Sequence, residues 1–102
     1  MKESYFQSKI IKQLREMGCF VIKMQQNATT IKAIPDVLFL YGNKYGFIEC
    51  KRKKPCPSDF QPGQEKKVEM FNKMSFARVA YPENWDKVLS EIKEFINGDQ
   101  DR

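Results

Sequence analysis

The sequence predicts a single α/β domain in which a mixed β-sheet is flanked by helices on both sides. The chain has 102 residues, enough to bury one hydrophobic core but not two. Apolar residues recur at helical spacing in three segments, and four short segments are rich in strand-forming residues. The middle strands are apolar on both faces, which is typical of strands covered on both sides.

The elements are expected in the order helix, three strands, helix, strand, helix. Their approximate ranges are 4–18, 19–24, 36–41, 44–51, 62 onward, 76–81 and 84–96. Each helix has one apolar stripe, formed by Phe6, Ile10, Leu14 and Met17, by Val68, Phe71 and Met74, and by Trp85, Val88, Leu89, Ile92, Phe95 and Ile96. Polar residues 25–33 predict a loop. Residues 1–97 would thus form one domain, followed by a flexible tail over 98–102.

The composition excludes several kinds of chemistry. The chain contains no histidine, which rules out Ser-His and Cys-His nucleophiles and zinc sites with histidine ligands. Cys19, Cys50 and Cys56 are odd in number and show no C-x-x-C spacing, so we expect reduced cysteines. No apolar run approaches the ~20 residues of a membrane span, and the first residues lack signal-peptide character. We therefore expect a cytoplasmic protein that has no membrane partner.

The charge balance predicts a polyanionic partner. Lys and Arg number 18 against 13 Asp and Glu, which gives a net charge of +5. Small basic domains often bind nucleic acid. The run Lys51-Arg52-Lys53-Lys54, extended by Lys66 and Lys67, is either a solvated surface or a contact for DNA phosphates. Tyr5, Phe60 and Tyr81 either stack on bases or pack at the core and its edge.

The Gly42-Asn43 dipeptide fixes a hairpin register that brings two acids together. If these two residues form the turn, Tyr41 faces Lys44 and Asp36 faces Glu49. Cross-strand partners share a face, with Cβ atoms ~5 Å apart, and Lys51 points to the same side as Glu49.

Two carboxylates at this distance repel each other unless a positive group lies between them. The group could be Lys51, or it could be Mg²⁺, which takes carboxylate oxygens and keeps several waters. The backbone carbonyl of Cys50 would be a third ligand. Alternatively, Asp36 simply begins a strand, and Glu49 and Lys51 form a solvated ion pair.

Pro35-Asp36 followed by Glu49-Cys50-Lys51 resembles the signature of the PD-(D/E)xK nucleases. The expected order of elements is similar to the restriction-endonuclease-like αβββαβ core of that superfamily. Glu3 resembles the acid on its first helix, and Pro62-Gly63-Gln64 resembles the Pro-x-Gln of the virus-type replication-repair nuclease (VRR-NUC) branch. Ala33-Ile34 stands where this branch often has a glycine.

The resemblance, which covers residues 3–81, implies a metal-dependent endonuclease that hydrolyses phosphodiester bonds in branched DNA such as four-way (Holliday) junctions. Asp36 and Glu49 would hold Mg²⁺ or Mn²⁺, and Lys51 would orient the attacking water or offset transition-state charge. Gln64 would bond that water or Lys51, or is an ordinary exposed first-turn residue. Glu3 would reach the metal through water, bind a second ion, or only compensate the helix dipole.

The resemblance also implies partners and an origin. It suggests a homodimer with two sites, contact with replication or repair proteins, and a viral or prophage-encoded protein in a bacterial host. Two alternatives stay open. One is a non-catalytic basic module that binds nucleic acid. The other is a nuclease subunit that is active only with a partner such as a helicase.

Overall fold

The computed structural model describes residues 2–25 and 32–98. The elements are α1 (Glu3–Glu16), β1 (Phe20–Lys23), β2 (Val37–Tyr41), β3 (Lys44–Cys50), a short 3₁₀ turn η1 (Pro57–Asp59), α2 (Gln64–Met74), β4 (Ala77–Ala80) and α3 (Trp85–Asn97). This is the order expected from the sequence. Most of the loop expected over 25–33, and the tail after residue 98, lie outside the described residues.

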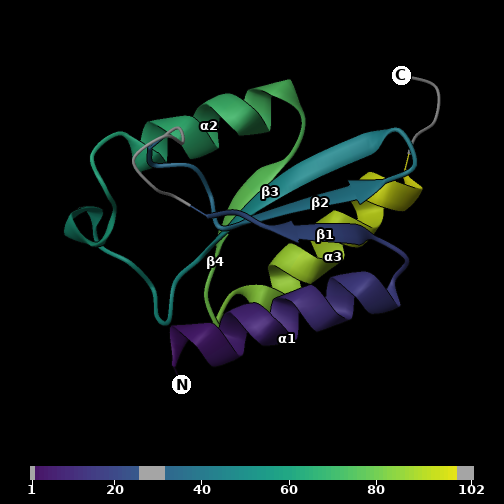
Figure 1. Cartoon of the computed structure of the whole chain (residues 1–102), viewed down its shortest axis with the longest axis horizontal. Helices are drawn as coiled ribbons and strands as arrows, with labels where there is room; N and C mark the ends of the chain where they lie inside the picture. Colours follow the sequence, from purple (N-terminus) through teal and green to yellow (C-terminus); the bar gives the residue numbers. More distant parts are fainter. Residues whose placement is uncertain (1, 26–31, 99–102) are drawn as a thin grey trace.

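The four strands form one mixed sheet in the order β1-β2-β3-β4 (Figure 1). The first three strands are antiparallel neighbours, and β4 runs parallel to β3. The hairpin register predicted from Gly42-Asn43 is confirmed over β2, where Tyr41 pairs with Lys44 and Leu38 pairs with Phe47. Gly42 has a φ of 60°, which suits a tight hairpin turn.

One face of the sheet packs against α1 and α3, which also contact each other. Phe6 of α1 meets the Trp85 ring edge-on, with centroids 6.2 Å apart. The core includes the inward side chains of both helices and, from the sheet, Val21, Val37, Phe39, Ile48, Cys50 and Ala80. The predicted stripes of α1 and α3 are therefore confirmed. Every helix within residues 2–25 and 32–98 is too short or too polar to traverse a lipid bilayer.

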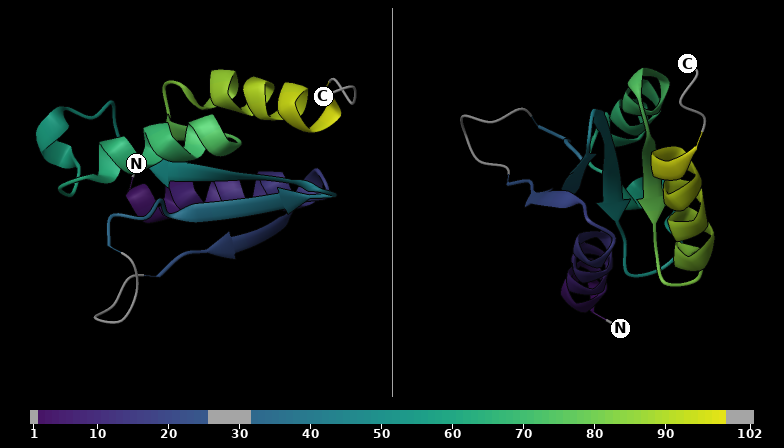
Figure 2. Two further views of the ribbon diagram at one scale, coloured as in Figure 1. Left: turned by 90° about the horizontal axis from the view of Figure 1, so that it is seen from above. Right: turned by 90° about the vertical axis from the view of Figure 1, so that its right-hand side faces the viewer.

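The opposite face is covered only in part. Helix α2 packs on β3 and β4, where the Phe71 ring stacks on Phe47 with centroids 4.5 Å apart. On that side no described helix lies over β1 and β2 (right view of Figure 2). The expectation of a sheet covered on both sides is therefore wrong for this half. Met74, expected to point inward, is 64% exposed, because two strands bury a narrower stripe of α2 than a whole sheet would.

Candidate active site

Asp36 is fixed by backbone contacts on both sides. Its carbonyl accepts the N–H of Met24 at 2.7 Å, which continues the pairing of β1 with β2. Its carboxylate Oδ2 accepts the N–H of Cys50 at 2.9 Å, at the end of β3. Ala33, three residues earlier, has a φ of 61°, in the left-handed region that favours glycine. A constrained turn thus leads into Asp36, whose carboxylate reaches across to β3.

Glu49 meets Asp36 as the hairpin register predicts. Its side chain is only 3% exposed. Burial, reinforced by the negative charge of Asp36, raises the pKa of Glu49 to about 7, although Lys51 opposes the shift. Burial also raises the pKa of Asp36, while the Cys50 N–H, Lys51 and a hydrogen bond with Glu49 lower it. The two carboxyl groups therefore share one small space in which both cannot ionise without cost.

Lys51 leaves β3 on the same side as Glu49. Its Nζ lies 3.2 Å from Oε2 of Glu49 and donates to the carbonyl oxygen of Asp59 at 2.8 Å. It also lies 4.9 Å from the centre of the Phe60 ring, a cation–π distance. The backbone N–H of Lys51 donates to the carbonyl oxygen of Ala80, the last residue of β4, at 2.8 Å. The ammonium is thus held by a carboxylate, a carbonyl and an aromatic face.

Glu3 reaches the site from the first turn of α1. The residue is exposed at the surface, but its carboxyl group is partly buried, and this burial is the main cause that raises its pKa. The negative charge of Asp36 raises the pKa further, whereas the positive charges of Lys51 and Arg52 lower it. Together with Lys51, Arg52 and Asp59 it lines a small pocket of about 180 Å³. The structure therefore brings Glu3 beside the acid pair, while its place in the first turn also suits the helix dipole.

Sequence reasoning missed three contributors to the site. Gln7 of α1 is buried and hydrogen-bonds the thiol of Cys50, whose pKa burial raises. It lies one helical turn after Glu3 and between Phe6 and Ile10 of the buried stripe, so its spacing could have identified it. Asp59 and Phe60 follow a proline-rich loop whose closure onto Lys51 leaves no periodic signal. Phe60 was considered only for base stacking or packing.

Gln64 opens α2 and is 3% exposed, so the alternative of an ordinary exposed residue is wrong. Its Oε1 accepts the N–H of Gln61 at 3.4 Å, whereas the ammonium of Lys51 is bonded to Glu49 and Asp59. Its bond to a water stays a prediction.

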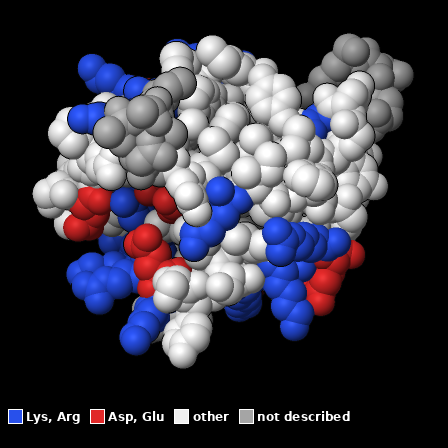
Figure 3. All heavy atoms as spheres, viewed as in Figure 1, with Lys and Arg blue, Asp and Glu red and all other residues white. Residues whose placement is uncertain are grey.

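The expected DNA contacts lie mainly at the surface. Arg52, Lys53, Lys54 and Lys66 are exposed, and Lys67 is half-buried. Figure 3 shows acidic groups close to several basic side chains at the left, near the N-terminus and η1.

The acid pair has the donor chemistry of a magnesium site. Among residues 2–25 and 32–98, no cluster of three or more His, Cys, Asp or Glu side chains is arranged to hold a metal ion. Mg²⁺ needs only one or two carboxylates, because it keeps waters and takes phosphate oxygens. Within the described part of the chain, Oε1 of Glu49 is buried and has no hydrogen-bond partner. A cation between the acids would satisfy this oxygen and remove their repulsion, so the residues present fit such an ion.

The backbone adds a third candidate ligand. In a strand, the N–H and carbonyl of one residue point to the same neighbouring strand, and the next residue points to the other. Since the N–H of Lys51 donates to Ala80 of β4, Cys50 directs its backbone groups to the β2 side, as its bond to Asp36 shows. Its side chain is fully buried in the core. These observations favour the Cys50 carbonyl in the position predicted for it.

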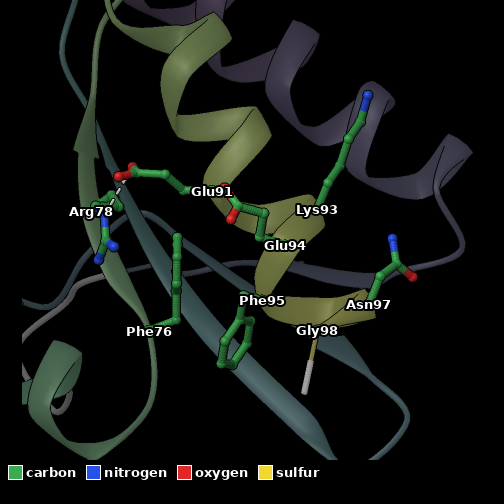
Figure 4. Close-up of a pocket in the computed structure, with 8 residues that line it drawn as sticks. All are labelled: Phe76, Arg78, Glu91, Lys93, Glu94, Phe95, Asn97 and Gly98. Atoms are coloured by element: carbon green, nitrogen blue, oxygen red, sulfur yellow. Dashed lines mark hydrogen bonds and ion pairs between the residues drawn. The ribbon is translucent and has the colours of Figure 1, made fainter. Parts of the chain in front are cut away.

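A wider hollow, of about 790 Å³, lies between β4 and α3 (Figure 4). Arg78 crosses it to Glu91 at 3.1 Å and stacks on the Phe76 ring at 4.2 Å. Glu91 is paired with Arg78 and only half-buried, and Glu94 is exposed, so neither carboxylate is buried like that of Glu49. This hollow therefore lacks the chemistry of the acid pair.

Comparison of the chain with protein-family models, with curated proteins and with solved structures finds no match in any of the three.

Proposed function

We propose that the protein is a metal-dependent endonuclease of the PD-(D/E)xK type with a restriction-endonuclease-like core, similar to the VRR-NUC branch. The observation that carries this proposal is the meeting of Asp36 and Glu49, two acids with raised pKa values, beside the ammonium of Lys51. The order of elements agrees with the αβββαβ core of that superfamily. A purely structural ion pair would not need a second, half-buried acid next to Glu49.

Each residue has a chemical task in this proposal. Asp36, Glu49 and the Cys50 carbonyl would hold Mg²⁺ or Mn²⁺, which would supply positive charge beside the scissile phosphate. When Glu49 is engaged in this way, the Asp59 carbonyl and the Phe60 ring still hold the ammonium of Lys51 in place. Lys51 can then orient the attacking water or offset the negative charge that develops on the phosphate.

The surface around the acids suits a DNA backbone. Arg52, Lys53 and Lys54 follow Lys51 directly after the strand that carries Glu49, so phosphates next to the cut would meet them. The elements described over residues 2–25 and 32–98 form one sheet with its helices, and none of them is a separate module that would read base sequence. Recognition of DNA shape, as in a four-way junction, is therefore the mode that we propose.

The test is cleavage of a labelled four-way junction with Mg²⁺, with Mn²⁺ and with a chelator. Wild-type protein should cut only with metal, and Asp36→Ala and Glu49→Ala should bind the junction without cutting it. Glu91→Ala, which removes an acid of the Arg78 pair at the other hollow, is the matched control and should cut normally. Binding without cutting under every metal would instead support a non-catalytic module. Cutting only after a helicase is added would support a partner-dependent subunit.

A further inference from the structure

The two edges of the sheet differ in how their backbone groups are bonded. In the described residues β1 and β4 are the outer strands. At the β4 edge the N–H of Ala77 donates to Asn72 at 3.1 Å, and the carbonyl of Ala77 accepts Arg78 at 2.9 Å. The carbonyl of Val79 accepts the side-chain amide of Asn84 at 3.0 Å. Side chains therefore close most of the β4 edge against another strand.

The edge of β1, at the outside of the sheet in the right view of Figure 2, is much less protected. The N–H of Met24 donates to Asp36 at 2.7 Å, toward β2. Strand alternation then directs the backbone N–H and carbonyl groups of Val21 and Lys23 away from β2. Among the described residues one side chain bonds these groups, since Arg15 donates to the Val21 carbonyl at 3.4 Å. The β1 edge can thus accept another strand.

A basic groove lies beside this edge, between α1 and β1. It has a volume of about 590 Å³ and is lined by Ser8, Ile11, Lys12, Arg15, Glu16 and Lys23. Three of these residues are cations and one is an acid. Within residues 2–25 and 32–98, none of the four takes part in an ion pair. The groove therefore has an excess of positive charge that no described acid neutralises.

The other side of β1 is apolar. Phe20 is 68% exposed and Ile22 is 39% exposed, and along the strand they alternate with Val21 and Lys23. Direct cross-strand partners share a face of the sheet. A strand added at the β1 edge would therefore place every second side chain beside Phe20 and Ile22, and the remaining side chains over the basic groove.

We propose that the β1 edge and the basic groove bind an extended segment of another protein in which acidic and apolar residues alternate. The segment lies antiparallel to β1, as β2 does on the other side of this strand. Its acidic residues exchange backbone hydrogen bonds with Val21 and Lys23. Their carboxylates face Lys12, Arg15 and Lys23 in the groove, and the apolar side chains cover the exposed side of β1.

The charge of the groove favours an acidic segment over other occupants. A neutral strand would cover Arg15 and Lys23 without compensating them, which disfavours it. The bond from Arg15 to the Val21 carbonyl is long, so Arg15 loses little when it turns to a carboxylate and releases that carbonyl. A nucleic acid strand fits less well, because its phosphates are acceptors and would meet the outward carbonyls of Val21 and Lys23. The inference is independent of nuclease activity, because none of these residues belongs to the proposed metal site.

Fluorescence anisotropy with the full chain and a labelled peptide tests the proposal. The peptide is short, has blocked ends and alternates valine with aspartate. Wild-type protein should bind it, and N-methylation of the aspartates, whose N–H groups would face β1, should weaken binding about tenfold. The matched peptide is N-methylated at the valines and should bind as the parent does, because those N–H groups would face solvent. A peptide with lysine in place of aspartate should not bind.

Two variants that change the charge of the protein equally test the groove. Lys12→Glu should weaken binding of the aspartate peptide about tenfold, because it places a carboxylate among those of the peptide. Lys9→Glu is the matched control and should bind normally, since Lys9 is exposed on the same helix but does not line the groove. Neither residue is in the core, so both variants should fold, as circular dichroism would verify.

Four results would overturn the proposal. The peptide could fail to bind at millimolar concentration. Equal affinities of the two N-methylated peptides would exclude strand pairing, and equal affinities of the Lys12 and Lys9 variants would exclude the groove. Binding of a single-stranded oligonucleotide, but not of the peptide, that is lost in Lys12→Glu would make this surface a nucleic-acid contact instead.

Discussion

Replacing Glu49 by Gln should stabilise the protein above pH 7 while abolishing metal-dependent cleavage. The pKa of Glu49 is raised from 4.5 to about 7 in the folded state, chiefly by burial. The folded state therefore binds more protons than the unfolded state between these pH values, and wild-type protein loses stability as the pH rises through that window. Glutamine has nearly the same shape as protonated glutamate and does not titrate.

The magnitude follows from the shift of the Glu49 pKa. A shift from 4.5 to about 7 corresponds to about 3 kcal/mol, at 1.36 kcal/mol per pH unit. The attraction of Lys51 already lowers this pKa, so loss of the ion pair is included in the figure. Glu49→Gln should thus equal wild-type protein near pH 4 and exceed its unfolding free energy by about 3 kcal/mol at pH 8. The melting temperature should then rise by roughly 15 °C.

Urea unfolding at pH values from 4 to 8, without divalent metal, measures this difference. The quantity to compare is the unfolding free energy of the variant minus that of wild-type protein, because other groups titrate in both. Glu91→Gln, in the surface pair with Arg78, is the control and should change stability by less than ~1 kcal/mol throughout. A Glu49→Gln difference that stays flat across the pH range would refute the buried, strained acid pair.

Three further predictions concern the metal, the ammonium group of Lys51 and the basic residues 52–54. Mg²⁺ at a hundredfold excess over its Kd should stabilise wild-type protein by about 3 kcal/mol in thermal unfolding at pH 8, and equal stabilisation of Asp36→Asn would argue against this metal site. Phe60→Leu should lower kcat for junction cleavage about fivefold with KM nearly unchanged, because the cation–π contact with Lys51 is lost. Phe60→Tyr keeps an aromatic ring and should have the kcat of wild-type protein, and a normal kcat in the leucine variant would count against this contact. Replacing Arg52, Lys53 and Lys54 by Gln should flatten the slope of log K for DNA binding against log salt by about 3, and an unchanged slope would identify the run as solvated surface.

Local chemistry explains why the sequence predicts most of the fold. The Gly42-Asn43 turn allows only a narrow set of backbone angles, and this alone determines the register of β2 with β3. Helix α1 ends where Gly18, with a φ of 97°, lets Cys19 donate to the Leu14 carbonyl at 3.0 Å. Coverage of the sheet was harder to predict, because the length and position of α2 depend on tertiary packing. The sequence therefore did not reveal that no described helix covers β1 and β2 on one side.

The candidate site also has a part that the sequence predicts and a part that it does not. Asp36, Glu49 and Lys51 could be placed together from the register, because period-two alternation and one turn suffice. The contacts of Asp59 and Phe60 could not be placed, because they depend on how an irregular loop closes. Gln7 was overlooked because only apolar residues were used to define the buried stripe of α1, although its spacing places it beside Phe6 and Ile10. It is buried, and it meets the Cys50 thiol beneath the acid pair.

The acid pair is more readily explained by function than by stability. A lone Glu49–Lys51 ion pair would satisfy both charges, yet Asp36 is held against Glu49 by the N–H of Cys50. Burial of each acid raises its own pKa, the charge of Asp36 raises the pKa of Glu49 further, and these shifts destabilise the fold at neutral pH. Such an arrangement persists when a ligand removes the repulsion, and a divalent cation supplies the charge that two carboxylates need. The same argument predicts that the stabilising effect of Mg²⁺ grows as the pH rises from 6 to 8, since protons compete for the same oxygens. If the effect of Mg²⁺ on melting temperature were independent of pH over this range, the cation would be bound elsewhere on the molecule.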